Sequence, residues 1–217
     1  MIEPFSEEQL RGFLHRPEQP SGDAIALTHG AGSNCKAPLL MAVAEEFAGA
    51  GLIVLRFDLA FRQARPSGPP RPGDAPLDRE GIRAAASAMR RIAVGRLFLG
   101  GHSYGGRQTS MLAAAEPAVA EGLLLLSYPL HPPRKPAQMR TAHLPQLSTP
   151  ALFVHGSRDP FGTLEEMRSA LALIPASTSL VDIEGAGHDL KRAGAAESIV
   201  KHFRAFMFPR YNSVNQP

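Results

Sequence analysis

The chain has 217 residues, which is long enough for a domain with a substantial hydrophobic core. Hydrophobic residues make up 44% and charged residues 20%, as in an ordinary globular protein. The formal net charge is +3, and the arginines that dominate the basic residues are scattered along the chain. We therefore expect no nucleic-acid partner, because nucleic-acid binders usually carry a basic stripe or a recognisable module.

Three further features of the sequence predict the cellular location of the protein. The longest purely aliphatic run, residues 123–126, is far too short to span a bilayer, and the N-terminus lacks the basic start and apolar stretch of a secretory signal. The lone cysteine, Cys35, excludes an intramolecular disulfide and fits a reducing compartment. These features predict a cytoplasmic protein with no membrane partner, and they leave its oligomeric state open.

Short apolar runs alternate with helical patterns, without an internal repeat or linker, so we expect a single domain over residues 1–217. Strands are predicted over residues 24–28, 52–57, 96–100, 122–127, 151–155 and 178–183, with an edge strand over 12–15. Helices are predicted over residues 38–50, 77–92, 107–115, 163–174 and 195–208. The strands are continuous apolar runs, as in parallel strands buried on both faces. This pattern predicts an α/β fold, with a doubly wound, mainly parallel sheet flanked by helices.

Two segments are predicted to lie outside the regular structure. Residues 58–75, rich in Pro, Gly and Arg, follow a strand and are interpreted as a solvated loop at the rim of the site. The alternative is that Arg62, Arg65 and Arg71 attract an anionic substrate. The polar tail, residues 211–217, is expected to be loose.

The most informative motif is Gly101-His102-Ser103-Tyr104-Gly105, which stands between a predicted strand and a predicted helix. A serine at the tip of such a sharp turn has a strained backbone, and its hydroxyl projects from the sheet. The glycines fit because strand and helix approach too closely there for side chains. A G-x-S-x-G pattern also occurs by chance, so its partners matter.

Two further segments supply those partners. A nucleophilic serine needs a histidine base, which in turn needs a carboxylate to orient it. In chain order, Asp159 follows the predicted strand over 151–155, and His188 follows the one over 178–183. Both positions lie at the carboxyl ends of strands, where the active residues of such folds gather. As alternatives, Asp159 before a proline could cap the next helix, and His188 could be a solvated loop residue.

An oxyanion formed by attack on a carbonyl needs two aimed N–H donors. We expect one from Tyr104, directly after the serine. The other should come from His29-Gly30-Ala31-Gly32-Ser33, called here the oxyanion loop, with Ala31 the predicted donor and Gly32 the next candidate. Gly32 is also expected to contact the substrate. The alternative is a glycine-rich turn that binds an anion at a helix start. His29 is predicted to brace this loop.

The remaining candidates are given lesser roles. His102 and His155 adjoin strand residues and are predicted to be structural, while Asp189 is the next-best acid. Cys35 is interpreted as an unreactive thiol. The histidines do not have the spacing of a metal site. We therefore expect no metal and no cofactor.

These segments resemble the α/β-hydrolase superfamily across nearly the whole chain. In detail, residues 100–107, 128–133 and 155–162 resemble a branch of small dienelactone-hydrolase-like proteins, which includes a testis-expressed protein and a subunit of a nuclear acetyltransferase complex in animals. The resemblance implies a serine triad at Ser103, Asp159 and His188, but not a substrate. Dienelactone hydrolases have a cysteine nucleophile where this chain has Ser103.

Many relatives insert a helical lid where this chain has only residues 127–149, so we expect no cap domain and an open site. The loops over residues 128–133 and 62–71 are predicted to form its walls, with Tyr128 contacting the substrate. The sequence thus predicts a serine hydrolase acting on a small-molecule carboxylic ester or thioester. The alternative is an interaction module that keeps the fold without catalysis, as in some animal relatives.

Overall fold

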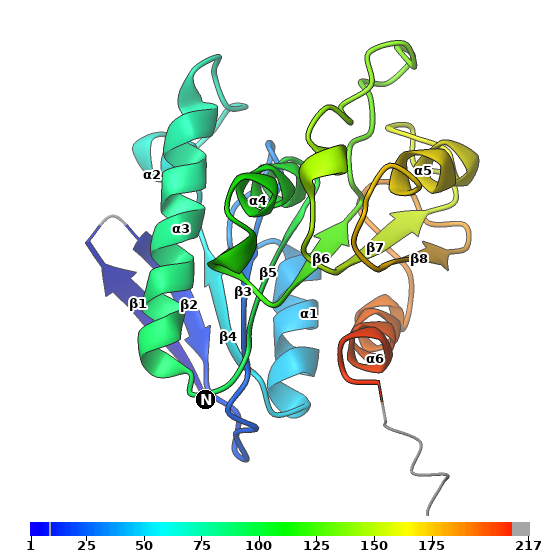
Figure 1. Ribbon diagram of the computed structural model, residues 1–217. Coiled ribbons are helices and arrows are strands. Elements are labelled where there is room, and N and C mark those ends of the chain that lie inside the picture. Colours follow the sequence, from blue (N-terminus) through cyan, green and yellow to red (C-terminus); the bar gives the residue numbers. More distant parts are fainter. Residues whose placement is uncertain (9, 210–217) are drawn as a thin grey trace, which may run out of the picture.

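An eight-stranded β-sheet forms the centre of the molecule, and helices cover both of its faces (Figure 1). The structure, a computed structural model, describes residues 1–8 and 10–209, so the predicted loose tail lies outside the described residues. The strands are β1 (Ile2–Glu7), β2 (Leu10–His15), β3 (Ala24–Thr28), β4 (Ile53–Phe57), β5 (Leu97–His102), β6 (Gly122–Leu126), β7 (Ala151–Gly156) and β8 (Thr178–Ile183).

The strand order confirms the predicted doubly wound, mainly parallel sheet. The strands lie in the order β1-β2-β4-β3-β5-β6-β7-β8; β3 to β8 are parallel to one another, and β2 is antiparallel to both of its neighbours. Strands β3 to β7 are buried at almost every position, because helices cover both of their faces. After β4 the chain crosses β3 to reach β5, which opens a crevice between the carboxyl ends of β3 and β5.

The helices form two layers. They are α1 (Pro38–Gly49), α2 (Ala60–Ala64), α3 (Asp74–Ile92), α4 (Tyr104–Ala115), α5 (Leu164–Leu171) and α6 (Ala195–Met207). Helices α1 and α6 pack on one face of the sheet, and α3, α4 and α5 pack on the other (Figure 1). Within the described residues, none of these helices has both the length and the apolar character needed to cross a membrane.

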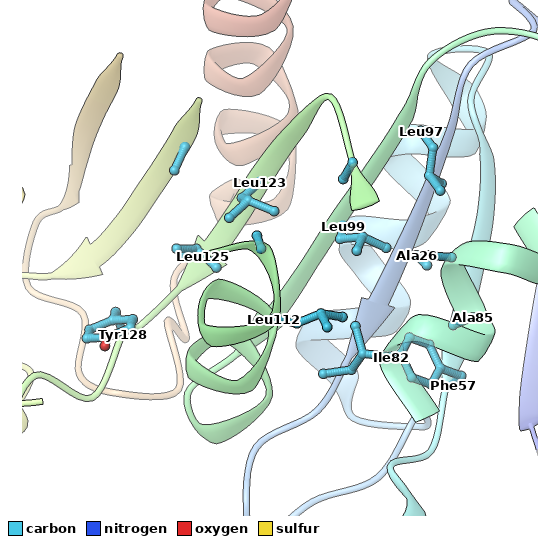
Figure 2. Close-up of a cluster of buried hydrophobic side chains, with 14 of the residues drawn as sticks. Ala26, Phe57, Ile82, Ala85, Leu97, Leu99, Leu112, Leu123, Leu125 and Tyr128 are labelled. Atoms are coloured by element: carbon cyan, nitrogen blue, oxygen red, sulfur yellow. The ribbon is translucent and has the colours of Figure 1, made fainter. Parts of the chain in front are cut away.

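Each face of the sheet has its own apolar core. Beneath α3 and α4, Leu99 and Leu125 of the sheet meet Ile82 and Leu112 of the helices (Figure 2). On the opposite face, Phe98 of β5 and Phe47 of α1 each meet Phe203 of α6 edge to face, with ring centroids 5.1 Å apart. Burying one such side chain contributes roughly 1.5–3 kcal/mol, so both layers hold β5 rigidly beneath the serine turn.

The N-terminal edge of the sheet differs from the prediction. The predicted edge strand over residues 12–15 is part of β2, which is covered by the additional strand β1. Strand β1 contains Pro4, and its residues are mostly exposed, so its sequence lacks the apolar run of a buried strand. A proline is tolerated there because an edge strand has one unpaired side.

Two helix starts also differ from the prediction. Helix α4 begins at Tyr104 instead of residue 107, and α3 begins at Asp74 instead of residue 77. The short helix α2 lies inside the predicted loop over residues 58–75. Glycines 105 and 106 concealed the start of α4, because glycine disfavours helix interiors unless close packing requires it.

The connection after β6 confirms that no separate cap domain is present among the described residues. Between Ser127 and Thr149, its regular structure is a single turn, Leu144–Gln146.

Candidate active site

Ser103 occupies a strained turn between β5 and α4. Its φ of 52° and ψ of −116° lie outside the ordinary regions for a residue with a side chain. The turn is anchored on both sides, because the Ser103 N–H donates to the carbonyl of Leu126 and its own carbonyl accepts from Arg107. The residue stands at the sheet's carboxyl end and is 8% exposed.

The glycines beside Ser103 are required by close backbone contacts. A Cβ on Gly101 would lie 2.8 Å from the backbone of Gly105. A Cβ on Gly105 would lie 2.5 Å from the carbonyl oxygen of His29, in the oxyanion loop. The turn thus brings three segments together: the end of β5, the start of α4 and the loop after β3.

His188 lies within hydrogen-bonding distance of the serine. The hydroxyl of Ser103 donates to Nε2 of His188 at 2.8 Å, and Nδ1–H of His188 donates to Oδ2 of Asp159 at 2.8 Å. These directions follow because an ionised carboxylate can only accept, which places the ring proton on Nδ1. The structure therefore brings Ser103, His188 and Asp159 into one chain of hydrogen bonds, in the order that general-base catalysis requires.

Asp159 is committed to this chain and does not cap the next helix. Its side chain is buried, and its other oxygen, Oδ1, accepts from the N–H of Phe161 at 2.9 Å. Helix α5 is instead capped by Thr163, which forms a capping box with Glu166. The capping alternative for Asp159 is therefore wrong.

His188 is positioned by more than Asp159. The ring of Phe161 stacks on it, with centroids 4.2 Å apart, so the imidazole is not a freely solvated loop side chain. On the other side, Nε2–H of His102 donates to the backbone carbonyl of His188 at 2.7 Å. Burial lowers the pKa of His102, which keeps its ring neutral.

Asp189, the alternative acid for His188, pairs with another residue. Asp189 is half exposed, and its carboxylate pairs with Lys191 at 3.1 Å. His155 donates from Nε2 to the carbonyl of Gly162 at 2.8 Å, as expected for a structural residue. Cys35 is buried, and burial with the nearby Asp58 raises the pKa of its thiol to about 12.

The oxyanion loop lies against the serine. A Cβ on Gly30 would be 3.4 Å from the Cβ of Ser103. Within the part of the chain that the structure describes, the N–H groups of Ala31 and Tyr104 donate to no other group, which leaves both available to a ligand. Their role as donors to an oxyanion remains a prediction.

His29 braces the loop from within. Its Nδ1–H donates to the carbonyl of Gly30 at 2.9 Å, and its Nε2 accepts from the N–H of Leu59 at 3.1 Å. In a trans peptide the carbonyl of Gly30 and the N–H of Ala31 point in opposite directions, so fixing one aims the other. Burial lowers the pKa of His29, and the neutral ring is the form that can both donate and accept.

Arg62 of α2 holds the same loop from outside. Its guanidinium donates to the carbonyls of Ser33 at 2.7 Å and Ala31 at 3.1 Å, and to Gly68 at 2.9 Å. The side chain is buried, although the sequence placed it in a solvated loop. Because its donors are taken by carbonyls, Arg62 is not free to attract an anionic substrate.

A second chain of hydrogen bonds supports the end of the loop. Arg56 donates from Nε to Nε2 of His15 at 2.8 Å and from its terminal nitrogen to the carbonyl of Cys35. Burial and the charge of Arg56 lower the pKa of His15 to about 4. The residues that follow the oxyanion loop are therefore tied to β4 and β2 through a neutral histidine.

Tyr104 is fixed by a buried carboxylate. Its hydroxyl donates to Oδ2 of Asp78 at 2.7 Å, and Oδ1 of Asp78 accepts from the N–H of Phe61. Burial raises the pKa of Asp78. Helix α3 begins at Asp74, which places Asp78 one turn into the helix and turns its side chain into the core.

The two remaining predicted residues have different surroundings. Gly32 is exposed, with open space around the position of a Cβ, so its predicted contact with substrate stays a prediction. Tyr128 is 1% exposed, and its hydroxyl donates to the carbonyl of Arg140 at 2.7 Å. The structure therefore places Tyr128 in the core instead of in a wall of the site (Figure 2).

Sequence reasoning missed the supporting residues Asp78, Arg56 and Phe161, and misjudged Arg62. One signal was available: Asp78 falls four residues before Ile82, on the apolar face of its helix, where an acid needs a partner. Arg62 and Phe161 carried no such signal, because their contacts are with segments far apart in the sequence. In residues 1–8 and 10–209, no three His, Cys, Asp or Glu side chains are arranged to hold a metal ion.

A family model described as an alpha/beta hydrolase domain matches residues 21–203. Solved structures share the fold. A dienelactone hydrolase from Anabaena variabilis is 22% identical, with a TM-score of 0.73 and 95% of each chain covered. Est1E from Butyrivibrio proteoclasticus is 17% identical, with a TM-score of 0.72 and coverage of 93% of this chain and 97% of that one.

A serine hydrolase without a lid from Xanthomonas campestris is also similar, at 16% identity, with a TM-score of 0.65 and 94% of each chain covered. At these identities the structures establish the fold alone, whereas the family model spans most of the sequence. The family model, the eight-stranded sheet and the serine turn after β5 agree in one assignment. The chain belongs to the α/β-hydrolase family.

Proposed function

We propose that this protein is a serine hydrolase that cleaves a carboxylic ester or thioester through an acyl-enzyme. The observation that carries the proposal is the unbroken hydrogen-bonded chain from Ser103 through His188 to Asp159, with both contacts at 2.8 Å. A serine hydroxyl is a weak nucleophile by itself, and this arrangement is the one that activates it.

In the proposed reaction, Oγ of Ser103 bonds to the carbonyl carbon while its proton passes to Nε2 of His188. Asp159 stabilises the imidazolium that forms. The N–H groups of Ala31 and Tyr104 hold the negative charge that develops on the carbonyl oxygen. His188 then returns the proton to the leaving alcohol or thiol as its bond to the carbonyl carbon breaks. Water repeats these steps to release the acid and restore Ser103.

The test is covalent labelling by a fluorophosphonate probe, which reacts with activated serines. We expect the native protein to be labelled and Ser103→Ala and His188→Ala to lose the label. Ser87→Ala, which changes an exposed serine on α3, is the matched control and should keep it. Absence of labelling in folded native protein would overturn the proposal and favour the alternative of an interaction module without catalysis.

A further inference from the structure

A cleft of about 680 Å³ lies beside the candidate active site, between α1 and the segment that leads into α6. This volume is within the range of small-molecule sites. The interior is mostly apolar and is formed by Leu39, Leu40, Ala42, Leu190, Ala195 and Ala196.

The cleft adjoins the segments that carry the reacting groups. Gly30, which lines it, lies against Ser103, with a Cβ placed on Gly30 3.4 Å from the Cβ of Ser103. His102 also lines it and holds the carbonyl of His188. Ser103 itself is not a lining residue, so a group in the cleft would reach the serine past Gly30.

The charged side chains around the cleft do not favour a charged ligand. Glu46, Glu197 and Arg192 also line the cleft, while Asp189 and Lys191 pair with each other at 3.1 Å. Acidic and basic groups thus nearly balance around an apolar interior. Such a surface favours a neutral hydrocarbon group over a carboxylate or phosphate, because burying a charge without a partner is costly.

The position of the cleft also indicates which part of an ester it holds. The leaving oxygen must come within hydrogen-bonding distance of Nε2 of His188 to receive its proton. One wall of the cleft, residues 189–192, directly continues the chain from His188, and the opposite wall continues from the oxyanion loop. From this chain continuity we infer that the group attached to the leaving oxygen is the part of the substrate that extends toward the cleft.

We propose that this cleft binds the apolar alcohol part of a neutral ester. The proposal rests on the proposed function, since it assigns the substrate class of the same site. It predicts selectivity by the length of the alcohol and indifference to the length of the acid.

The experiment compares two ester series by the rate of acid release. The alcohol series is ethyl, butyl and hexyl acetate, and the acyl series is methyl acetate, butanoate and hexanoate. Because each buried methylene contributes about 0.8 kcal/mol, kcat/KM should rise by about fourfold per methylene along the alcohol series only. A flat alcohol series, or a rise along the acyl series instead, would overturn the proposal.

Variants test whether the dependence of kcat/KM on alcohol length arises in this cleft. Ala196→Phe on α6 and Ala42→Phe on α1 fill the cleft from opposite walls, so each should flatten the alcohol series. Ala205→Phe, on an exposed position of α6 outside the cleft, is the matched control and should keep the full slope. A slope that survives in both folded filling variants would refute the assignment of the cleft.

A binding measurement separates this proposal from the proposed function. We expect 1-hexanol to shift the backbone amide NMR signals of residues 39–46 and 189–197, and Ala196→Phe to abolish these shifts. Shifts without fluorophosphonate labelling would retain the cleft as a binding site and reject the hydrolase. Labelling of Ser103 without hexanol shifts would retain the hydrolase and reject the cleft.

Discussion

Ser103, His188 and Asp159 hold one another in place, whereas the oxyanion loop is held by residues that take no direct part in the proposed chemistry. The first group forms its own hydrogen-bonded chain across the loops after β5, β7 and β8. The loop after β3 is instead fixed by His29 and by Arg62 of α2. We call Ser103, His188 and Asp159 the nucleophile side, and the oxyanion loop with its supporting residues the oxyanion side. We infer that the geometry of the nucleophile side depends on the identity of its three residues, whereas that of the oxyanion side depends on a network of supporting contacts.

The largest predicted effect tests the nucleophile side. Asp159→Asn should lower kcat about 10⁴-fold, because an amide favours the wrong tautomer of His188. Asp189→Asn is the matched change at the neighbouring acid, which pairs with Lys191, and should cause a far smaller loss. Ester hydrolysis by the two purified variants, with melting curves as a check on folding, measures the difference; similar losses would contradict the assignment of Asp159.

The second prediction concerns the point where the two sides touch. Gly105→Ala would place a Cβ 2.5 Å from the carbonyl oxygen of His29, a backbone atom that cannot rotate away. We expect a loss of about 3 kcal/mol in the free energy of unfolding, as for overpacking in a rigid core. Gly49→Ala, at a helical glycine with open space around it, is the control and should not destabilise the protein. Equal denaturation midpoints for the two variants would show that the contact is not restrictive.

The third prediction isolates the support of the oxyanion loop. Arg62→Met removes the donors to Ala31 and Ser33 while keeping the volume of the side chain. We expect kcat to fall about 100-fold with little change in KM, because a displacement of roughly 1 Å in a catalytic group has that cost. Arg65→Met, whose partner is Asp74, is the control on the same segment and should keep most activity. A change in KM alone would indicate substrate binding by Arg62 instead of positioning.

The smallest predicted effect is the dependence of the free energy of unfolding on pH. The pKa of His15 is lowered to about 4 in the folded protein from an ordinary value of 6.5, so the unfolded chain binds the extra proton between these values. Its contribution to stability is therefore present above pH 6.5 and is lost as the pH falls toward 4. Between pH 7 and 5 we expect a loss of roughly 2 kcal/mol from this group. His15→Gln keeps an acceptor for Arg56 and should make urea denaturation less dependent on pH; an unchanged slope would exclude His15 as the cause.

Much of the nucleophile side could be predicted from the sequence. Ser103, Asp159 and His188 each follow a predicted strand, and the carboxyl ends of parallel strands share one edge of the sheet. The wrongly placed residues were those whose surroundings depend on distant segments. Tyr128 follows a strand in the same way, yet its side chain is buried in the core beneath α4.

The sequence by itself determined the α/β sheet, the serine turn and the order of its partners, because these depend on local apolar patterns and on glycines within a few residues of Ser103. Only the tertiary structure decided how the oxyanion loop is held and where the apolar cleft lies. Arg62 meets Ala31 across 31 positions of the chain, and His15 meets Arg56 across 41. Such contacts bury polar groups that must be paired after folding, and single-residue patterns along the chain do not specify their partners.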